Sequence, residues 1–426
     1  MTGNRRMVGL ATAVLLVTAA ACGGSDDAGP SDTEADDAVT TAEVADSSAP
    51  NTAAATTAST ATPSTTSTTL PVDDIDINHV QVIGSHNSYH LIPEPVLFEA
   101  IAALSPELAS SIEYTHLPLS EQLGDHGIRQ FEIDVFADPD GGLFASRAAN
   151  PVVGLEAASG LAELDEPGFK VLHTQDFDYG TNCLTLVLCL EEIRDWSNAN
   201  PSHVPIMIMI EMKEESVVDA AAAEGIEIDI ELDWAEPIAM TPELLDALDA
   251  EIRSVFAPEH IIEPDEVRGD APTLDDAVRT TGWPTLATSR GQVLFTMTNG
   301  GRIRDLYTAG APSLEGRPVF TSASPGAPDA AFVRFDDPTD PGLDQAALDG
   351  YIIRTRTDSP TADARNNDTA RRDAAFASGA HYLSTDYYVP SEFFDSDYVV
   401  EFSGGAVARC NPVTAPASCD DAELVE

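Results

Sequence analysis

Positively charged residues are scarce in this sequence. Its 426 residues include 21 lysines and arginines against 72 aspartates and glutamates, a formal net charge of −51. Lysine occurs only as Lys170 and Lys213. A protein that binds nucleic acid through bulk charge must neutralise many phosphates, so this class is excluded. Hydrophobic residues make up 43% of the chain, enough for a sizeable core, and the length allows one large domain or two medium ones.

Long apolar runs are also missing, except at the start of the chain. Arg5 and Arg6 precede an apolar run over residues 7–21, and residues 1–22 have the layout of a secretory signal. The residues that end at Cys22 resemble a bacterial lipobox, in which the cysteine is lipidated; an ordinary cleaved signal is the alternative. No other run approaches the roughly 20 residues that span a bilayer. We expect an exported protein, lipid-anchored through Cys22 to the outer face of a bacterial membrane, or secreted.

Large apolar residues are scarce in residues 23–75, which are rich in Ser, Thr, Ala and Asp. Such a composition cannot bury enough surface to offset chain entropy, so we expect a disordered stalk. The folded domain is predicted over residues 76–420.

Cysteine is rare, and its count of five is odd. With Cys22 set aside, the rest form two close pairs: Cys183 with Cys189, and Cys410 with Cys419. In the oxidising compartment beyond a signal peptide, these spacings predict two short-range disulfides. The second would staple residues 403–419 as a C-terminal clasp.

Within the folded domain, apolar β-rich runs alternate with helix-like stretches, a pattern typical of α/β folds with a parallel sheet. Eight such runs predict a closed (β/α)₈ barrel. The runs are residues 79–84, 128–136, 169–173, 204–211, 292–297, 318–322, 351–356 and 381–385, with 332–335 as an alternative for the sixth. Residues 214–285 exceed one crossover and predict an insertion with a helix over 241–256.

Polar residues follow four of the predicted strands, at the end where barrels place their active sites. Glu132 and Asp134 are two residues apart, so both carboxylates face the same side of their strand. Asn87 follows the first strand and Glu211 ends the fourth. These four residues form an all-oxygen ligand set that suits a hard divalent cation, whereas zinc prefers nitrogen and sulfur.

Two histidines, His86 and His173, stand beside these residues at the ends of the first and third predicted strands. An unperturbed histidine pKa of about 6.5 lies close to working pH, which suits proton transfer. Two histidines around a metal-held phosphate could cleave a phosphodiester, one accepting the proton of the nucleophile and the other supporting the leaving group.

Because cationic residues are scarce, the positions of the few that occur point to candidate binding sites. Lys213 lies two residues beyond Glu211 and could reach a substrate phosphate, although a solvated lysine is the alternative. Lys170 precedes the third apolar run, so we expect it at the opposite end of the barrel in a structural role.

Arg354 and Arg356 share one face of the seventh strand and could clamp a phosphate. An ion pair with Asp358 or Asp386 is the alternative for this arginine pair. Tyr388 follows the eighth strand and could stack on a sugar-like ring, with a packing role equally compatible.

Together these residues resemble the X-region of calcium-dependent phosphoinositide phospholipases C, and above all the secreted bacterial branch. The resemblance covers roughly residues 76–420. The motifs that carry it are His86-Asn87, residues 127–134, His173, Ile210-Glu211, residues 181–196, 269–274, 384–388 and 408–412.

The resemblance implies a TIM-like barrel, Ca²⁺ as cofactor, and cleavage of phosphatidylinositol-type lipids by attack of the inositol 2-hydroxyl on phosphorus. The products would be diacylglycerol and a cyclic or open inositol phosphate. His86 and His173 would be the catalytic pair, and the calcium ligands would be Asn87, Glu132, Asp134 and Glu211. The implied partner is a phosphoinositide at a membrane surface. From the acidic charge we expect no nucleic-acid partner, and we expect a monomer.

Two other functions fit the same residues. A glycerophosphodiester phosphodiesterase uses the same barrel, but such enzymes show a His-Arg pair on the first strand where this chain has His86-Asn87. An anchored barrel that binds a ligand without turnover is the other alternative. The acidic surface also poses a problem for a lipid substrate, because anionic membranes attract basic segments.

Overall fold

The computed structural model describes residues 74–219, 232–358 and 361–426. The predicted signal, Cys22 and almost all of the predicted stalk lie outside the described residues. Within the described residues, no helix is long and apolar enough to cross a membrane.

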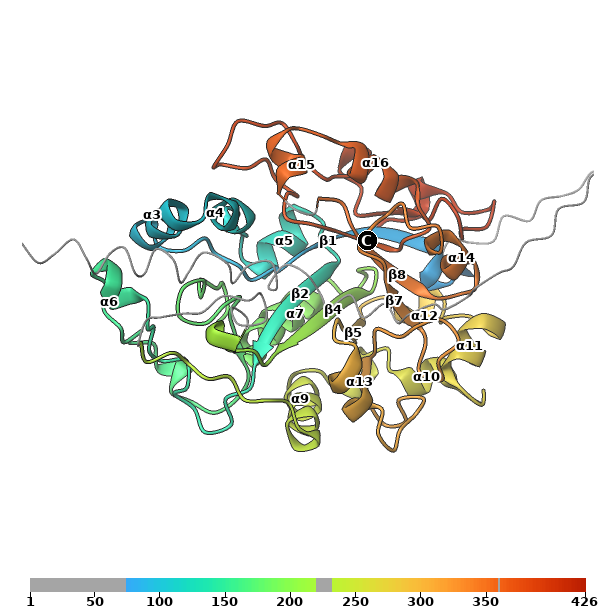
Figure 1. Cartoon of the computed structure of the whole chain (residues 1–426). Coiled ribbons are helices and arrows are strands. Elements are labelled where there is room, and N and C mark those ends of the chain that lie inside the picture. The colour runs from blue at the N-terminus through green and yellow to red at the C-terminus, as the bar shows by residue number, and fades with distance from the viewer. Residues whose placement is uncertain (1–73, 220–231, 359–360) are drawn as a thin grey trace, which may run out of the picture. The chain divides into compact units, whose positions relative to one another are not determined.

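Eight parallel strands form a nearly closed barrel, as the alternation of apolar runs predicts (Figure 1). They are β1 (Val80–Ser85), β2 (Gln130–Phe136), β4 (Ile206–Lys213), β5 (Val293–Met297), β6 (Val319–Phe320), β7 (Phe332–Arg334), β8 (Ile352–Arg356) and β9 (Tyr382–Thr385). Their order is β6-β5-β4-β2-β1-β9-β8-β7. A single parallel bridge between Ser322 and Phe332 links the β6 segment to β7 and brings the ends of the sheet together.

The predicted third strand, residues 169–173, is wrong as a member of the parallel barrel. It forms β3 (Lys170–Val171), which pairs antiparallel with the end of β2. One edge of β2 is fully paired with β4, whereas β1 pairs with the other edge only at Gln130. The rest of that edge is free for β3. The alternative range 332–335 supplies the eighth parallel strand, β7, in addition to β6.

The reversed direction of β3 also corrects the expected place of Lys170. Lys170 lies opposite Phe136, the last residue of β2, and therefore at the carboxyl end of the barrel. Its fully buried ammonium donates to the carbonyl oxygens of Glu166 and Gly168, at 2.6 and 3.1 Å. These contacts are those of a packed structural residue, but they lie at the carboxyl end of the barrel and not at the amino end as expected.

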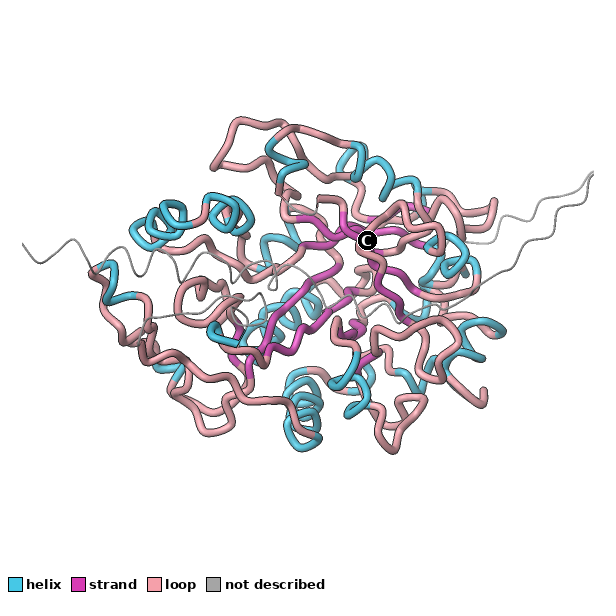
Figure 2. The backbone as a smooth tube through the Cα atoms, viewed as in Figure 1, coloured by secondary structure: helices cyan, strands magenta, loops and turns pink. Residues whose placement is uncertain are grey.

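The helices lie around the strands (Figure 2). They are α3 (Pro95–Leu104), α4 (Pro106–Ile112), α5 (Leu119–Asp125), α6 (Asn150–Val153), α7 (Leu186–Ala199), α9 (Pro242–Val255), α10 (Pro264–Arg268), α11 (Leu274–Thr280), α12 (Leu286–Ser289), α13 (Gly301–Tyr307), α14 (Leu343–Leu348), α15 (Ala362–Arg365) and α16 (Ala370–Ala377). Short 3₁₀ turns are η2 (Ile77–His79), η3 (Ala162–Leu164), η4 (Pro258–His260), η5 (Ser403–Gly405) and η6 (Asp421–Glu423). The predicted helix over 241–256 is confirmed as α9, where the Thr241 hydroxyl caps the first turn by accepting from the Leu244 amide.

The core lies between the strands and the surrounding helices. Strand β4 reads Ile-Met-Ile-Met-Ile over its first five residues, and all five are buried. A parallel strand covered on both faces is continuously apolar for this reason. Polar residues appear only where β4 ends, at Glu211 and Lys213, which places them at the rim.

Both predicted disulfides are present, Cys183–Cys189 and Cys410–Cys419. The second closes the C-terminal clasp, in which β10 (Ala408–Cys410) pairs antiparallel with β1. The first lies at the beginning of α7.

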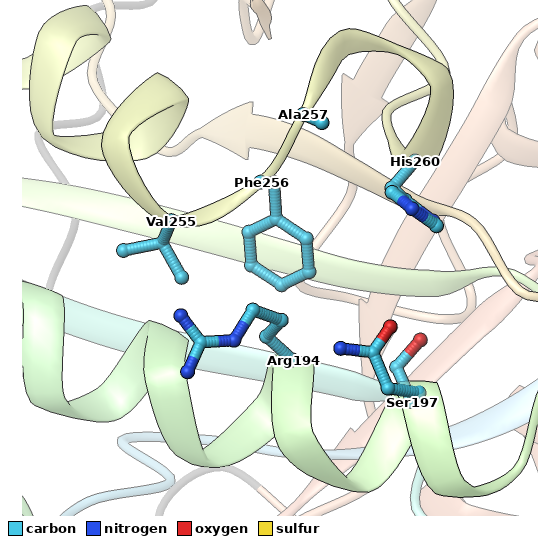
Figure 3. A pocket seen from close by; sticks show the side chains of 7 residues that line it. Arg194, Ser197, Val255, Phe256, Ala257 and His260 are labelled. Atoms are coloured by element: carbon cyan, nitrogen blue, oxygen red, sulfur yellow. The ribbon is translucent and has the colours of Figure 1, made fainter.

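A hollow of about 200 Å³ lies between α7 and the segment that follows α9 (Figure 3). It is lined by Arg194, Ser197, Asn198, Val255, Phe256, Ala257 and His260. The Ser197 hydroxyl is within 3.4 Å of the carbonyl oxygen of Gly291, just before β5 begins. The hollow therefore lies near the amino ends of the strands, away from the predicted site.

Candidate active site

The predicted site residues meet at the carboxyl ends of neighbouring strands. Glu132 and Asp134 lie on one face of β2, and Asp134 is directly opposite Glu211 of β4. His86 and Asn87 follow β1, which lies on the other side of β2. Parallel pairing thus brings residues more than 100 positions apart to one rim.

The turn after β1 fixes Asn87. Its backbone adopts a left-handed conformation (φ 43°), which asparagine tolerates better than most residues. Its side-chain amide donates to the Tyr114 hydroxyl at 3.1 Å, which leaves the amide oxygen available. Ser88 ties the turn to β2, because its amide donates to the Glu132 carbonyl and its hydroxyl accepts from the Glu132 amide.

Three carboxylates cluster beside this turn. The Lys213 ammonium lies 2.6 Å from Glu211 Oε1 and 3.3 Å from Asp134 Oδ2. Arg354 donates to Glu132 at 2.5 Å. Burial raises the pKa of Asp134 to about 8 against the lowering effect of Lys213, and the two neighbouring carboxylates add to the rise.

The cluster fits a hard divalent cation. Both Asp134 oxygens are buried and meet no donor in good hydrogen-bond geometry among the described residues, although the Tyr89 hydroxyl is close enough to lower the Asp134 pKa. Carboxylate and amide oxygens are the ligands that Ca²⁺ prefers, and a cation among them would offset the cost of burying the charges.

His86 is held by a carboxylate that an arginine neutralises. Its Nδ1 is 2.9 Å from Asp386 Oδ1, and Arg356 donates to Asp386 Oδ2 at 2.9 Å. Burial and the nearby Arg356 hold the pKa of His86 well below its usual value. His86 is therefore a neutral imidazole, the form that can accept a proton.

His173 is held by a carboxylate that a second histidine shares. Its Nδ1 is 2.6 Å from Asp178 Oδ2, and His90 Nε2 is 2.9 Å from the other Asp178 oxygen. Burial opposes the Asp178 anion, yet the two histidines hold its pKa well below the usual range. His173 Nε2 is buried and has no hydrogen-bond partner among the described residues.

These three groups form a possible metal site of their own, since candidate ligand atoms of His90, His173 and Asp178 lie within 4.8 Å of one another. Two imidazoles and one carboxylate suit zinc better than calcium. The hydrogen bonds from both rings to Asp178 account for the arrangement.

The predicted substrate-binding residues lie at the rim, but most are already engaged. Arg354 pairs with Glu132 and Asp336, and Arg356 forms the ion pair with Asp386 that was the alternative to a phosphate clamp. Lys213 is held by the carboxylates.

Tyr388 is buried at the same rim. Its hydroxyl accepts from the Leu117 amide at 3.0 Å, and its ring stacks on His116 with centroids 5.4 Å apart.

Asp178 and Asp386, the carboxylates that hold the two histidines, were missed as orienting residues. Asp386 directly follows β9, and a polar residue at the end of a barrel strand is a usable signal. Asp178 belongs to a hairpin-like turn in which Thr174 pairs with it, a local feature without a sequence signature.

The barrel holds two carboxylate-paired histidines beside a cluster of acidic residues. This arrangement suits acid–base cleavage of a phosphodiester. A family model described as "Phosphoinositide phospholipase C, Ca2+-dependent" matches residues 75–412. The chain belongs to this calcium-dependent family, and it is a phosphodiesterase of the phosphatidylinositol-specific phospholipase C type.

Solved structures with some likeness to the chain include three bacterial enzymes. A calcium-dependent phosphoinositol-specific phospholipase C from Pseudomonas sp. is 15% identical over 80% of this chain and 96% of its own, with a TM-score of 0.47. A Ca²⁺-dependent phosphatidylinositol-specific phospholipase C from Streptomyces antibioticus is 18% identical over 74% and 95%, with a TM-score of 0.44. The phosphatidylinositol-specific phospholipase C from Listeria monocytogenes is 15% identical over 73% and 89%, with a TM-score of 0.36. A search of curated proteins found no match.

Proposed function

We propose that the chain cleaves the phosphodiester of phosphatidylinositol-type lipids, with His86 as general base and His173 as general acid. The observation that carries the proposal is the pairing of each histidine's Nδ1 with a buried carboxylate beside the acidic cluster. This pairing leaves Nε2 of each ring for proton transfer.

The proposed reaction transfers one proton at each histidine. The inositol 2-hydroxyl gives its proton to His86 Nε2 as its oxygen bonds to phosphorus, and the bond from phosphorus to the glycerol oxygen breaks. His173 Nε2 gives a proton to that oxygen. The products are diacylglycerol and a cyclic inositol phosphate, which water can open in a second step.

We propose Asn87, Glu132, Asp134 and Glu211 as the residues that hold Ca²⁺. When bound, Ca²⁺ would lower the pKa of the attacking hydroxyl and stabilise charge on the phosphate oxygens. The burial of Asp134 beside the carboxylates of Glu211 and Glu132, with no donor in good hydrogen-bond geometry, supports this assignment.

Among the remaining rim residues, we propose Lys213 as the one that contacts the substrate phosphate. Its side chain is 17% exposed, whereas Arg354 and Arg356 are buried in ion pairs. We assign these two arginines to holding Glu132 and Asp386. Tyr388 acts by packing on His116, and its contact with an inositol ring stays a prediction.

Phosphorus NMR on two substrates tests the function. With phosphatidylinositol and Ca²⁺, we expect a cyclic inositol phosphate signal, and excess chelator should abolish it. Turnover of glycerophosphoinositol to glycerol phosphate, with phosphatidylinositol untouched, would instead establish the glycerophosphodiester phosphodiesterase alternative. Full activity in chelator would disprove the metal assignment.

We also propose that the chain is exported and anchored by lipid on Cys22, and that it works as a monomer. The layout of residues 1–22 supports export. Labelling of the cell-expressed protein with a fatty-acid probe should be lost in Cys22→Ser, and labelling of that variant would disprove the anchor.

A further inference from the structure

Lys213 occupies an unusual position among the acidic residues. It lies two residues beyond Glu211 on β4, so both side chains emerge on the same face of the strand. Its ammonium lies between Glu211 Oε1, at 2.6 Å, and Asp134 Oδ2, at 3.3 Å. One lysine therefore contacts carboxylates from two neighbouring strands.

Asp134 depends on this ammonium. Among residues 74–219, 232–358 and 361–426, Lys213 is the only cation within ion-pair distance of Asp134, and the Tyr89 hydroxyl that also interacts with this carboxyl carries no charge. Its side chain is 1% exposed, so bulk water does little to stabilise a charge there. Glu132 has a separate cation, Arg354, which is also tied to Asp336.

The ammonium and a divalent cation need the same space. Ca²⁺ binds carboxylate oxygens at about 2.3–2.6 Å. An ammonium that is already 2.6 and 3.3 Å from two proposed ligand oxygens blocks such an approach and repels a second cation. Ca²⁺ can bind Asp134 Oδ2 and Glu211 Oε1 together only if the lysine side chain withdraws.

We infer that Lys213 is a tethered counter-cation that competes with Ca²⁺ for Asp134 and Glu211 and is released when Ca²⁺ binds. This inference rests on the calcium site proposed above. It adds that an ammonium of the chain itself offsets the negative charge of the Asp134 and Glu211 pair when Ca²⁺ is not there to do so. The released ammonium can then pair with an anionic phosphodiester, so metal and substrate binding become coupled.

Calorimetric titration of the chelator-treated protein with CaCl₂ tests the competition. We expect Lys213→Met to bind Ca²⁺ at least about 10-fold more tightly than the wild type, because the competitor is gone. Lys213→Arg, which keeps the charge, is the matched control and should not gain affinity. Equal or weaker binding by Lys213→Met would overturn the inference while leaving the proposed function intact.

Failure of the proposed calcium-dependent function would give a different result in the same titration. If neither the folded wild type nor Lys213→Met binds Ca²⁺, both the competition and the proposed metal ligands are wrong. Thermal unfolding in chelator checks that the variant is folded, and Lys213→Gln replaces it if the methionine variant is not.

A second measurement needs no substitution. The chain has only two lysines, and Lys170 is fully buried, so acetylation by acetic anhydride followed by mass spectrometry reports on Lys213 with Lys170 as an internal control. We expect Ca²⁺ to speed the acetylation of Lys213 several-fold and to leave Lys170 unchanged. Tighter Ca²⁺ binding by Lys213→Met without faster acetylation in the wild type would reduce Lys213 to a repelling charge and overturn its release.

Discussion

The rim histidines His86 and His173 differ from two histidines at the amino end, His203 and His381, in what they bond to. At the carboxyl end, Nδ1 of both His86 and His173 faces a carboxylate. At the amino end, His203 bonds a serine hydroxyl and a backbone carbonyl, and His381 bonds two backbone groups. Burial is common to both ends, so burial alone does not identify a catalytic histidine.

The partner decides which protonation states a buried ring can visit. A carboxylate stabilises the imidazolium, so a histidine beside it can gain and lose a proton during a reaction. His381 Nδ1 accepts from the Ile353 amide, and a proton there would face another N–H group. Burial lowers the pKa of His381 to about 3, which keeps the ring neutral and structural.

The largest expected effect is the loss of either rim histidine. His86→Ala and His173→Ala should each lower kcat on phosphatidylinositol by at least about 10²-fold, because proton transfer is lost. His203→Ala, at the amino end, is the matched control and should keep nearly full kcat per folded molecule. Wild-type rates in both rim variants would end the acid–base proposal.

A smaller effect should follow from removing the carboxylate partners. We expect Asp178→Asn and Asp386→Asn to lower kcat by about 10-fold to 10²-fold, as for other outer-shell partners of functional histidines. The change removes a charge but little volume, so KM should move less than kcat.

A substrate with a better leaving group separates the two carboxylates. Nitrophenolate departs without a proton, so an inositol nitrophenyl phosphate should restore most of the rate of Asp178→Asn and little of the rate of Asp386→Asn. Equal recovery of both variants would contradict the assignment of His173 as the acid and His86 as the base.

Changes at the amino end of the barrel should alter the free energy of unfolding and not kcat. The folded pKa of His381, about 3, lies below the unfolded value of about 6.5. The unfolded chain therefore binds more protons between these values, and stability is lost as pH falls from 6.5 towards 3, by up to about 1.4 kcal/mol per pH unit.

Urea unfolding at pH 7, 6 and 5 measures this loss. We expect the free energy of unfolding to fall more steeply for the wild type than for His381→Asn, which cannot titrate. The difference between the two slopes isolates His381 from the carboxylates that also titrate. Parallel slopes would show that His381 does not stay neutral in the fold.

The smallest expected effect concerns the partner of His203. Ser197→Ala removes a buried hydroxyl 2.7 Å from His203 Nε2 and should lower the free energy of unfolding by about 1–2 kcal/mol, with kcat unchanged. Ser254→Ala, at an exposed serine of α9, is the control and should change stability little. A fall in kcat for Ser197→Ala would contradict the view that the amino end affects stability and not catalysis.

The rim position of several site residues could be predicted, because each is marked by a local pattern in the sequence. Glu132 and Asp134 follow from spacing along one strand, and Glu211 and Lys213 follow from the point where an apolar run turns polar. The helix over 241–256 follows from its cap. The antiparallel β3 could not be predicted, because it depends on which edge of β2 is left unpaired.

Local patterns in the chain are enough to predict the α/β alternation, the two short disulfides, the acidic balance, and the histidines and carboxylates that meet at the rim. Their partners depend on the folded barrel: Asp386 for His86, Asp178 for His173, and Arg354 for Glu132 across 222 positions. This is because secondary structure follows local patterns of side chains, whereas a buried charge takes its counter-charge from whichever strand the barrel places next to it.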